Sequence, residues 1–341
     1  MTRIRASSGV LAGIVAVLVA GGLLVAGCRG SADDAPRPFT VKVGSVLSVA
    51  HPTVRALSFL EKRLEELSGG RFDVVIFPAS QLGGQDQMLD GCRTGDVQMT
   101  QISAAVVSEY VPLANALSMP FIFRDSDHQV RVLEGEPGRR IAEQAREVGL
   151  EILGYLDSGT RNITTRRGPI EKPEDLRGMK IRVMDSKVMV RTINALGASA
   201  VAMNQGEVFT ALQQGVLDGW ENNPQTVVDQ RMYETGCIYF AWTRHFAIPD
   251  VLMASKVFLD RLTPEERGWV EQAVRETIEM QRGMWQAETI KALEIMRENG
   301  MKINDVDLAP FQARVDPIYR EYYAKFGDEF RELCETIRNM P

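Results

Sequence analysis

Residues 179–203, with the sequence MKIRVMDSKVMVRTINALGASAVAM, decide the fold of this chain. The apolar runs Met179–Met184 and Ala198–Met203 are typical of strands. Between them, Ser186–Leu196 has helical spacing and ends before Gly197, a residue type that commonly stops a helix. A strand, a helix and a second strand in this order are typical of an α/β sheet. We therefore predict an α/β fold.

The first part of the chain repeats this scheme. We predict a strand over Phe39–Leu47, a helix over Thr53–Ser68 and a strand over Phe72–Phe77. The two parts also contain a similar short segment, which we call the echo: RTGDVQ at 93–98 and QQGVLD at 213–218 each look like a helix end, a glycine stop and a short strand. The chain is also longer than one hydrophobic core usually supports. Two similar α/β lobes are therefore expected.

A long helix is predicted over residues 264–300, where apolar side chains recur at helical spacing. Pro264 suits its first turn, and Gly300 suits its end. One helix of this length would brace both lobes. The alternative is two helices with a kink at Gly283.

The N-terminal segment predicts export. An apolar run, Val10–Ala26, follows Arg3 and Arg5 and ends in small residues, which is typical of a secretory signal over residues 1–27. Because Cys28 comes directly after Gly27, the segment resembles a bacterial lipobox, and Cys28 would be the lipidated first residue of the mature chain. Residues 28–38 are polar and contain proline, as expected for a flexible tether. The alternative is a transmembrane helix, for which the run is short.

Composition and motifs exclude several functions. Loss of Arg3 and Arg5 with the signal changes the formal net charge from −6 to −8, so nucleic acid is not an expected partner. No nucleotide-binding, hydrolase or metalloprotease motif is present, and the three histidines have no metal-ligand spacing. We expect no cofactor, no metal and no enzymatic activity. The alternative is a lipid-anchored enzyme with His51 or His245 as general base.

Besides Cys28, the chain has three cysteines, Cys92, Cys237 and Cys334. Because this number is odd, at least one thiol is free.

Polar side chains at predicted strand ends are the candidate binding residues. Arg161 lies in SGTRN, Arg182 in KIRV and Asn222 in DGWENNP. An arginine inside an apolar strand needs an anion, because a buried unpaired guanidinium is costly and its planar fork matches a carboxylate. For Arg182 this anion is either a ligand or one of two neighbours in the chain, Asp185 and Glu221.

From about Phe39 to about Leu333, the chain resembles the DctP-type extracytoplasmic solute-binding subunit of tripartite ATP-independent periplasmic (TRAP) transporters. The resemblance is carried by FPASQLG at 77–83, LSMPFIF at 117–123, DLRGMKIRV at 175–183, EVFTALQ at 207–213 and DGWEN at 218–222. It implies a two-lobed periplasmic-binding-protein-like fold with a sheet in each lobe, hinge segments and the long bracing helix. We expect lobe 1 to contain 39–158 and 247–285, and lobe 2 to contain 159–246 and 286–341.

The resemblance also implies a binding site. Arg182 would pair bidentately with the ligand carboxylate, Arg161 would approach the ligand, and Asn222 would hydrogen-bond the carboxylate. Gln85 and Ser103 match ligand contacts in the first lobe, and Gln205 occupies a place where some members present an aromatic ring. Two further candidates come from the residues themselves: Trp220 could stack on a sugar ring, and His51 could donate to a ligand hydroxyl or simply start a surface helix.

The expected function is capture of a small organic acid and its delivery to ion-gradient-driven TRAP membrane subunits. The protein would act outside the cytoplasm, in the periplasm or at the cell surface, anchored by lipid. Phrases at 206–215, 221–224 and 245–249 look most like members that bind sugar acids such as uronates or aldonates. A C4-dicarboxylate or a 2-oxo acid is the alternative ligand.

Overall fold

The computed structural model describes residues 38–341. The predicted signal segment, Cys28 and the tether up to residue 37 lie outside the described residues. No described helix is long and apolar enough to cross a membrane.

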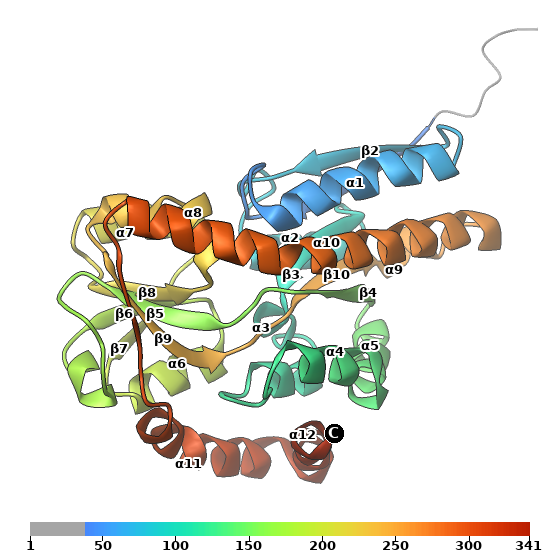
Figure 1. Cartoon of the computed structure of the whole chain (residues 1–341). Coiled ribbons are helices and arrows are strands. Elements are labelled where there is room, and N and C mark those ends of the chain that lie inside the picture. The colour runs from blue at the N-terminus through green and yellow to red at the C-terminus, as the bar shows by residue number, and fades with distance from the viewer. Residues whose placement is uncertain (1–37) are drawn as a thin grey trace, which may run out of the picture. The chain divides into compact units, whose positions relative to one another are not determined.

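Two β-sheets organise the described chain (Figure 1). The first has the strand order β2-β1-β3-β10-β4. Its strands are β1 (Phe39–Ser45), β2 (Phe72–Phe77), β3 (Met99–Ser103), β4 (Leu150–Leu156) and β10 (Asp250–Ser255). The pairs β1–β2 and β1–β3 are parallel, and β10 runs antiparallel to both of its neighbours.

The second sheet has the order β11-β9-β5-β8-β6-β7. Its strands are β5 (Arg161–Thr165), β6 (Lys180–Val183), β7 (Ser199–Ala202), β8 (Gly219–Asn222), β9 (Tyr239–Phe246) and β11 (Lys302–Asp305). Strand β5 runs antiparallel to β8 and β9, whereas β6 runs parallel to β7 and β8. The two-lobed α/β prediction is therefore confirmed.

Helices surround both sheets. The α-helices are α1 (Pro52–Leu67), α2 (Gln85–Thr94), α3 (Ala104–Val107), α4 (Ser126–Glu134), α5 (Glu136–Glu147), α6 (Lys187–Ala195), α7 (Gln205–Gln213), α8 (Pro224–Asp229), α9 (Lys256–Leu259), α10 (Pro264–Glu298), α11 (Ala309–Phe326) and α12 (Asp328–Asn339). The 3₁₀ helices are η1 (Pro112–Ser118), η2 (Pro173–Leu176) and η3 (Met232–Thr235).

Helix α10 is one continuous helix of 35 residues, which decides against a break at Gly283. Its start is fixed by a capping box, in which Thr263 Oγ1 accepts from Glu266 N at 3.2 Å and Glu266 Oε2 accepts from Thr263 N at 2.9 Å. The helix contacts α1 and β4 of the first lobe and α8 of the second (Figure 1). It therefore bridges the two lobes.

The echo at 93–98 and 213–218 is only partly correct. Helix α2 ends at Thr94, and Gly95 follows in a left-handed conformation with φ 90°. Helix α7 ends at Gln213, and Gly215 has φ 73°. The strands after them start at Met99 and Gly219, directly behind the echoed residues rather than inside them.

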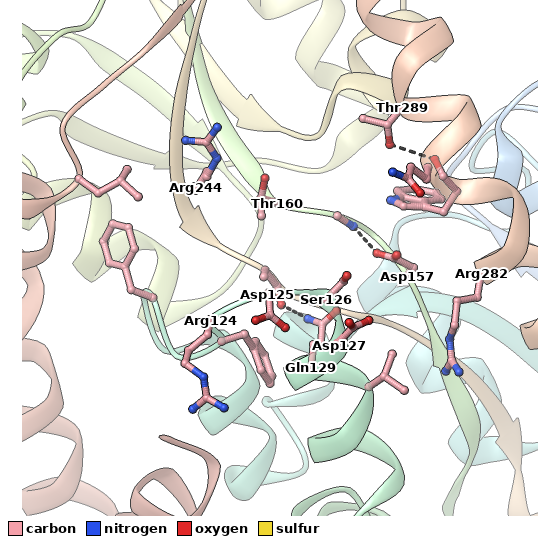
Figure 2. A pocket seen from close by; sticks show the side chains of 18 of the residues that line it. Arg124, Asp125, Ser126, Asp127, Gln129, Asp157, Thr160, Arg244, Arg282 and Thr289 are labelled. Atoms are coloured by element: carbon pink, nitrogen blue, oxygen red, sulfur yellow. Dashed lines mark hydrogen bonds between the residues drawn. The ribbon is translucent and has the colours of Figure 1, made fainter. Parts of the chain in front are cut away.

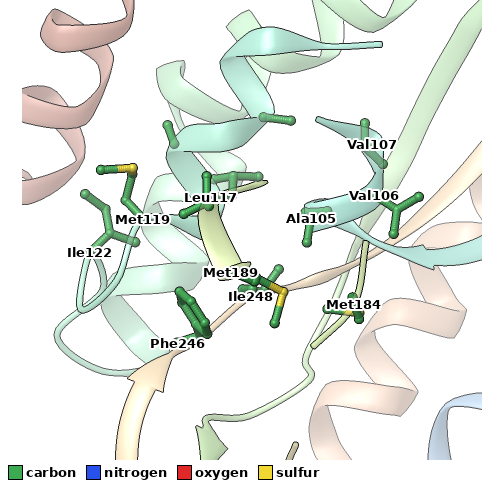
Figure 3. Close-up of a cluster of buried hydrophobic side chains, with 14 of the residues drawn as sticks. Ala105, Val106, Val107, Leu117, Met119, Ile122, Met184, Met189, Phe246 and Ile248 are labelled. Carbon is green, nitrogen blue, oxygen red and sulfur yellow. The ribbon is translucent and has the colours of Figure 1, made fainter. Parts of the chain in front are cut away.

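The largest hydrophobic core cluster joins the two lobes. Figure 3 shows Val106 and Leu117 from the first-sheet side close to Met184 and Met189, which follow β6. Phe246, at the end of β9, completes this layer. The chain passes between the sheets nearby, at 157–160 and 247–249. The strands of each sheet come from the segments that we predicted for one lobe. The exact boundaries of the lobes stay a prediction.

Candidate functional site

Two small neighbouring cavities lie between the sheets. The first, of about 30 Å³, is lined by Val46, Leu47, Gln85, Gln101, Ser103, Ser158, Arg161, Met184, Gln205, Asn222, Thr226 and Asp250, and we call it the ligand cavity. The second, of about 20 Å³, is lined by Gln85, Asp86, Val106, Glu109, Arg182, Met184, Asp185, Met203, Asn204 and Gln205, and we call it the arginine cavity. Gln85, Met184 and Gln205 border both. The two cavities therefore form parts of one site.

Arg182 is a buried cation without a carboxylate partner among residues 38–341. It lies on β6, and its side chain donates to Met203 O, from Nε at 2.8 Å and from Nη2 at 2.5 Å, and to Gln205 Oε1 at 3.0 Å. These bonds use three of the five N–H groups of a guanidinium. Burial lowers the pKa of Arg182 to about 9, so the side chain is still charged at neutral pH. An anion is thus needed at this position.

Arg161, in contrast, has an anion within the chain. Its Nε lies 2.6 Å from Glu221 Oε2 and its Nη2 lies 2.8 Å from Glu221 Oε1, and both side chains are buried. The antiparallel pairing of β5 with β8 brings the two residues together. Glu221, one of the two expected partners of Arg182, is therefore taken by Arg161. His245 approaches Glu221 at 3.7 Å, but burial lowers the pKa of His245 to about 3 and keeps it neutral.

Side-chain amides supply neutral donors to the site. Gln85 Oε1 accepts from Ser103 N at 2.6 Å, and Asn222 Oδ1 accepts from Asn223 N at 2.9 Å. Because each oxygen is held by the backbone, each NH₂ group is directed away from that bond. The buried Nε2 of Gln205 has no partner among the described residues. Such donors suit a ligand that is rich in oxygen.

Two candidates from the sequence lie outside these cavities. Trp220 is fully buried in a hydrophobic cluster with Val208, Leu212, Phe240 and Met296. Its ring is enclosed by core side chains because β8 is an inner strand of its sheet. His51 is also buried: it caps α1 by accepting from Thr53 N at 3.2 Å, and its Nε2 faces Thr226 Oγ1 at 3.4 Å. The expected contacts of Trp220 and His51 with a ligand are thus not part of the observed lining.

Sequence reasoning missed one charged residue of the ligand cavity, Asp250. It begins β10, where it pairs in register with Ser103 of β3 and Leu156 of β4. The available signal was a lone carboxylate directly before the apolar run VLMA at 251–254. Asp250 lines the cavity because the second sheet lies close to this strand end. That placement depends on distant parts of the chain and cannot be predicted from the local sequence.

A much larger cavity, of about 810 Å³, is lined by the connection between β4 and β5, by the start of α4 and by α10 (Figure 2). We call it the rear cavity. Asp157, Gly159 and Thr160 line it, whereas Ser158 and Arg161 line the ligand cavity. The segment 157–161 therefore forms a wall of both cavities.

The described residues contain no group of three His, Cys, Asp or Glu side chains that could hold a metal ion. Cys92, Cys237 and Cys334 are free and buried, which is the arrangement expected of isolated thiols.

Residues 43–325 match the family described as "Bacterial extracellular solute-binding protein, family 7" (DctP). The protein YiiZ of Salmonella typhimurium, whose function is uncharacterized, is 36% identical over 275 residues, which cover 79% of this chain and 83% of YiiZ.

Solved structures agree. A TRAP periplasmic solute-binding protein from Sulfitobacter sp. NAS-14.1 with bound β-D-galacturonate is 30% identical, with a TM-score of 0.86, over 88% of this chain and 100% of the other. One from Roseobacter denitrificans with bound β-D-glucuronate is 29% identical, with the same TM-score, over 89% and 100%. Fold and sequence thus agree over 88 to 89% of this chain, and the chain belongs to family 7 of the bacterial extracellular solute-binding proteins, as a DctP-type subunit of a TRAP transporter.

Proposed function

We propose that this protein captures a sugar acid, a uronate or an aldonate, outside the cytoplasm and presents it to the membrane subunits of its transporter. The observation that carries the proposal is Arg182, a buried cation without a carboxylate partner among the described residues. A guanidinium in this setting matches a ligand carboxylate bidentately. The hexuronates bound by the Sulfitobacter and Roseobacter proteins support the same ligand class.

The remaining contacts favour one carboxylate and several hydroxyls. In our proposal, Asn222 assists Arg182, while Gln85, Ser103 and Gln205 bind ligand oxygens. Arg161 contributes N–H donors, but Glu221 already balances its charge. A dicarboxylate would need a second unbalanced cation, and neither cavity is lined by one.

Binding requires the lobes to move. A cavity of about 30 Å³ holds about one water molecule and no six-carbon acid. We propose that the lobes open about the connections at 157–160 and 247–249, with α10 bridging them, and close again around the ligand. Closure excludes water and strengthens the contact between the ligand carboxylate and Arg182.

A thermal-shift series tests the ligand class. We expect galacturonate, glucuronate or galactonate to raise the unfolding midpoint more than succinate, malate or pyruvate at equal concentration. At about 100 times Kd, a ligand that binds only the folded state adds about 2.7 kcal/mol to the free energy of unfolding. If dicarboxylates raise the midpoint and every sugar acid leaves it unchanged, the sugar-acid proposal is wrong.

We also propose that Cys28 carries the lipid that holds the protein at the membrane. Cys28→Ser should move the protein to the soluble fraction, because stable anchoring depends on more than one acyl chain. Membrane fractionation of both forms measures this, with Cys92→Ser as the control that keeps the anchor. Equal membrane association of the Cys28→Ser variant and the wild-type protein would refute the anchor.

A further inference from the structure

Asp250 is the only carboxylate among the residues that line the ligand cavity. Its side chain belongs to a residue that is 8% exposed, and it stands beside Ser103 in the first sheet. Asp250 is a hydrogen-bond acceptor, unlike the amide donors described above, and it forms no ion pair among residues 38–341. A carboxylate of this kind in a solute-binding cavity requires a hydrogen-bond donor, which a ligand can supply.

The charge of Asp250 is not balanced by its surroundings. Arg161, the only cation that lines the ligand cavity, is held bidentately by Glu221. The hydrogen-bond partner of the Asp250 carboxyl is the neutral side chain of Gln101, whose Oε1 also accepts from Ser45 Oγ at 2.6 Å. An ionised carboxylate offers about four lone-pair positions, so most of its acceptor capacity remains available.

We propose that Asp250 sets the specificity of the site, by accepting hydrogen bonds from ligand hydroxyls and by excluding a ligand that carries a second carboxylate. This inference rests on the proposed sugar-acid function. It assigns Asp250 as the partner of the end of the ligand that lies away from Arg182.

The arrangement of the two cavities supports this role. Arg182 lines the arginine cavity and Asp250 lines the ligand cavity, with Gln85 and Gln205 on the border between them. A ligand whose carboxylate meets Arg182 therefore extends its other groups toward Asp250. Hydroxyls there donate to the carboxylate, whereas a second carboxylate meets a like charge in a water-poor site.

The protonation state of Asp250 allows a second test of this role, by a change of pH. Burial raises the pKa of Asp250 to about 7; nearby Arg161 on β5 acts against this shift, and Asp157 on the β4–β5 connection adds to it. Strand β3 faces it with the neutral Gln101 and Ser103. The exclusion of a second carboxylate should thus be strong above pH 7 and weaken below it. His51 and His245 have pKa values lowered by burial to about 4 and about 3, so neither changes charge between pH 6 and 8.

Galactonate and galactarate form the matched probes, because they differ only in the replacement of a terminal CH₂OH by a carboxylate. The quantity to measure by calorimetry is the ratio of Kd for galactarate to Kd for galactonate. At pH 8 we expect Asp250→Asn to lower this ratio at least about tenfold, because like charges in contact cost several kcal/mol. The wild-type ratio should fall from pH 8 to pH 6, and the ratio of the Asn variant should not.

Asp127→Asn is the control, since it removes an exposed carboxylate on α4 that lines the rear cavity and not the ligand cavity. It should keep the wild-type ratio at pH 8. An unchanged ratio in Asp250→Asn, or an equal fall in Asp127→Asn, overturns the role of Asp250. If the Asn variant does not fold, the wild-type pH series decides: a ratio that is constant from pH 8 to pH 6 overturns it. If the wild-type protein binds neither probe nor any hexuronate, the proposed function fails and this inference fails with it.

Discussion

Two arginines on neighbouring parts of one sheet have opposite electrostatic surroundings. Arg161 is neutralised by Glu221, whereas Arg182 is surrounded by the carbonyl of Met203 and the amide of Gln205. In the sequence, both arginines are candidate binding residues at predicted strand ends. The difference arises from the antiparallel pairing of β5 with β8, which joins residues 60 positions apart. This pairing gives Arg161 the only fully buried glutamate of residues 38–341.

At this scale we expect Arg182→Lys to lose nearly as much affinity as Arg182→Ala. An ammonium cannot form the two parallel bonds of a guanidinium with a carboxylate, and truncation of one partner of a buried charge pair costs about 2 to 5 kcal/mol. Calorimetry with galacturonate measures both variants. Arg191→Lys is the matched control, because Arg191 pairs with Glu321 at the surface. Near-wild-type affinity of Arg182→Lys would mean that Arg182 has only a structural role.

Among the elements, α10 determines how the lobes are connected. One glycine inside the helix and one after its end differ in conformation. Gly283 is exposed inside the helix, and an added Cβ at this position would meet no atom within 4 Å. Gly300 follows the helix with φ 78°, a conformation that L-residues with a side chain rarely adopt.

We therefore expect substitutions at these two glycines to have opposite signs. Gly283→Ala should raise the free energy of unfolding by about 0.4 to 1 kcal/mol, because alanine restricts the unfolded chain and favours the helix. Gly300→Ala should lower it by about 1 to 2 kcal/mol through backbone strain. Denaturant unfolding of the two variants measures both. A loss of stability in Gly283→Ala would indicate that the helix must bend at this position.

Local patterns in the sequence predicted these elements well. Strand β2 matches its prediction exactly, and β6, α6 and β7 lie within one residue of their predicted ends. Capping and glycine stops explain this, because they act within a few residues. The pairing of β10 between β3 and β4 depends on contacts about 100 to 150 residues apart in sequence and could not be predicted from local patterns.

For the whole molecule, membership in a family of solute-binding proteins confirms the prediction of a binding protein rather than an enzyme. The sequence also named five residues that line the ligand cavity: Gln85, Ser103, Arg161, Gln205 and Asn222. It missed Asp250, and it could not show that Trp220 is enclosed by the core. Both facts depend on how one sheet is placed against its own helices and against the other sheet.

The rear cavity has a practical consequence. Gln286 on α10 lines it and is exposed, whereas the thiols of Cys92, Cys237 and Cys334 are fully buried. In a Cys28→Ser background, Gln286→Cys therefore supplies the single thiol open to a maleimide dye. A solvent-sensitive fluorophore there stands clear of the ligand cavity but next to the segment 157–161, which lines both cavities and, in our proposal, moves when the lobes open. The labelled protein would therefore act as an optical sensor, in which the dye reports solute binding from outside the ligand cavity.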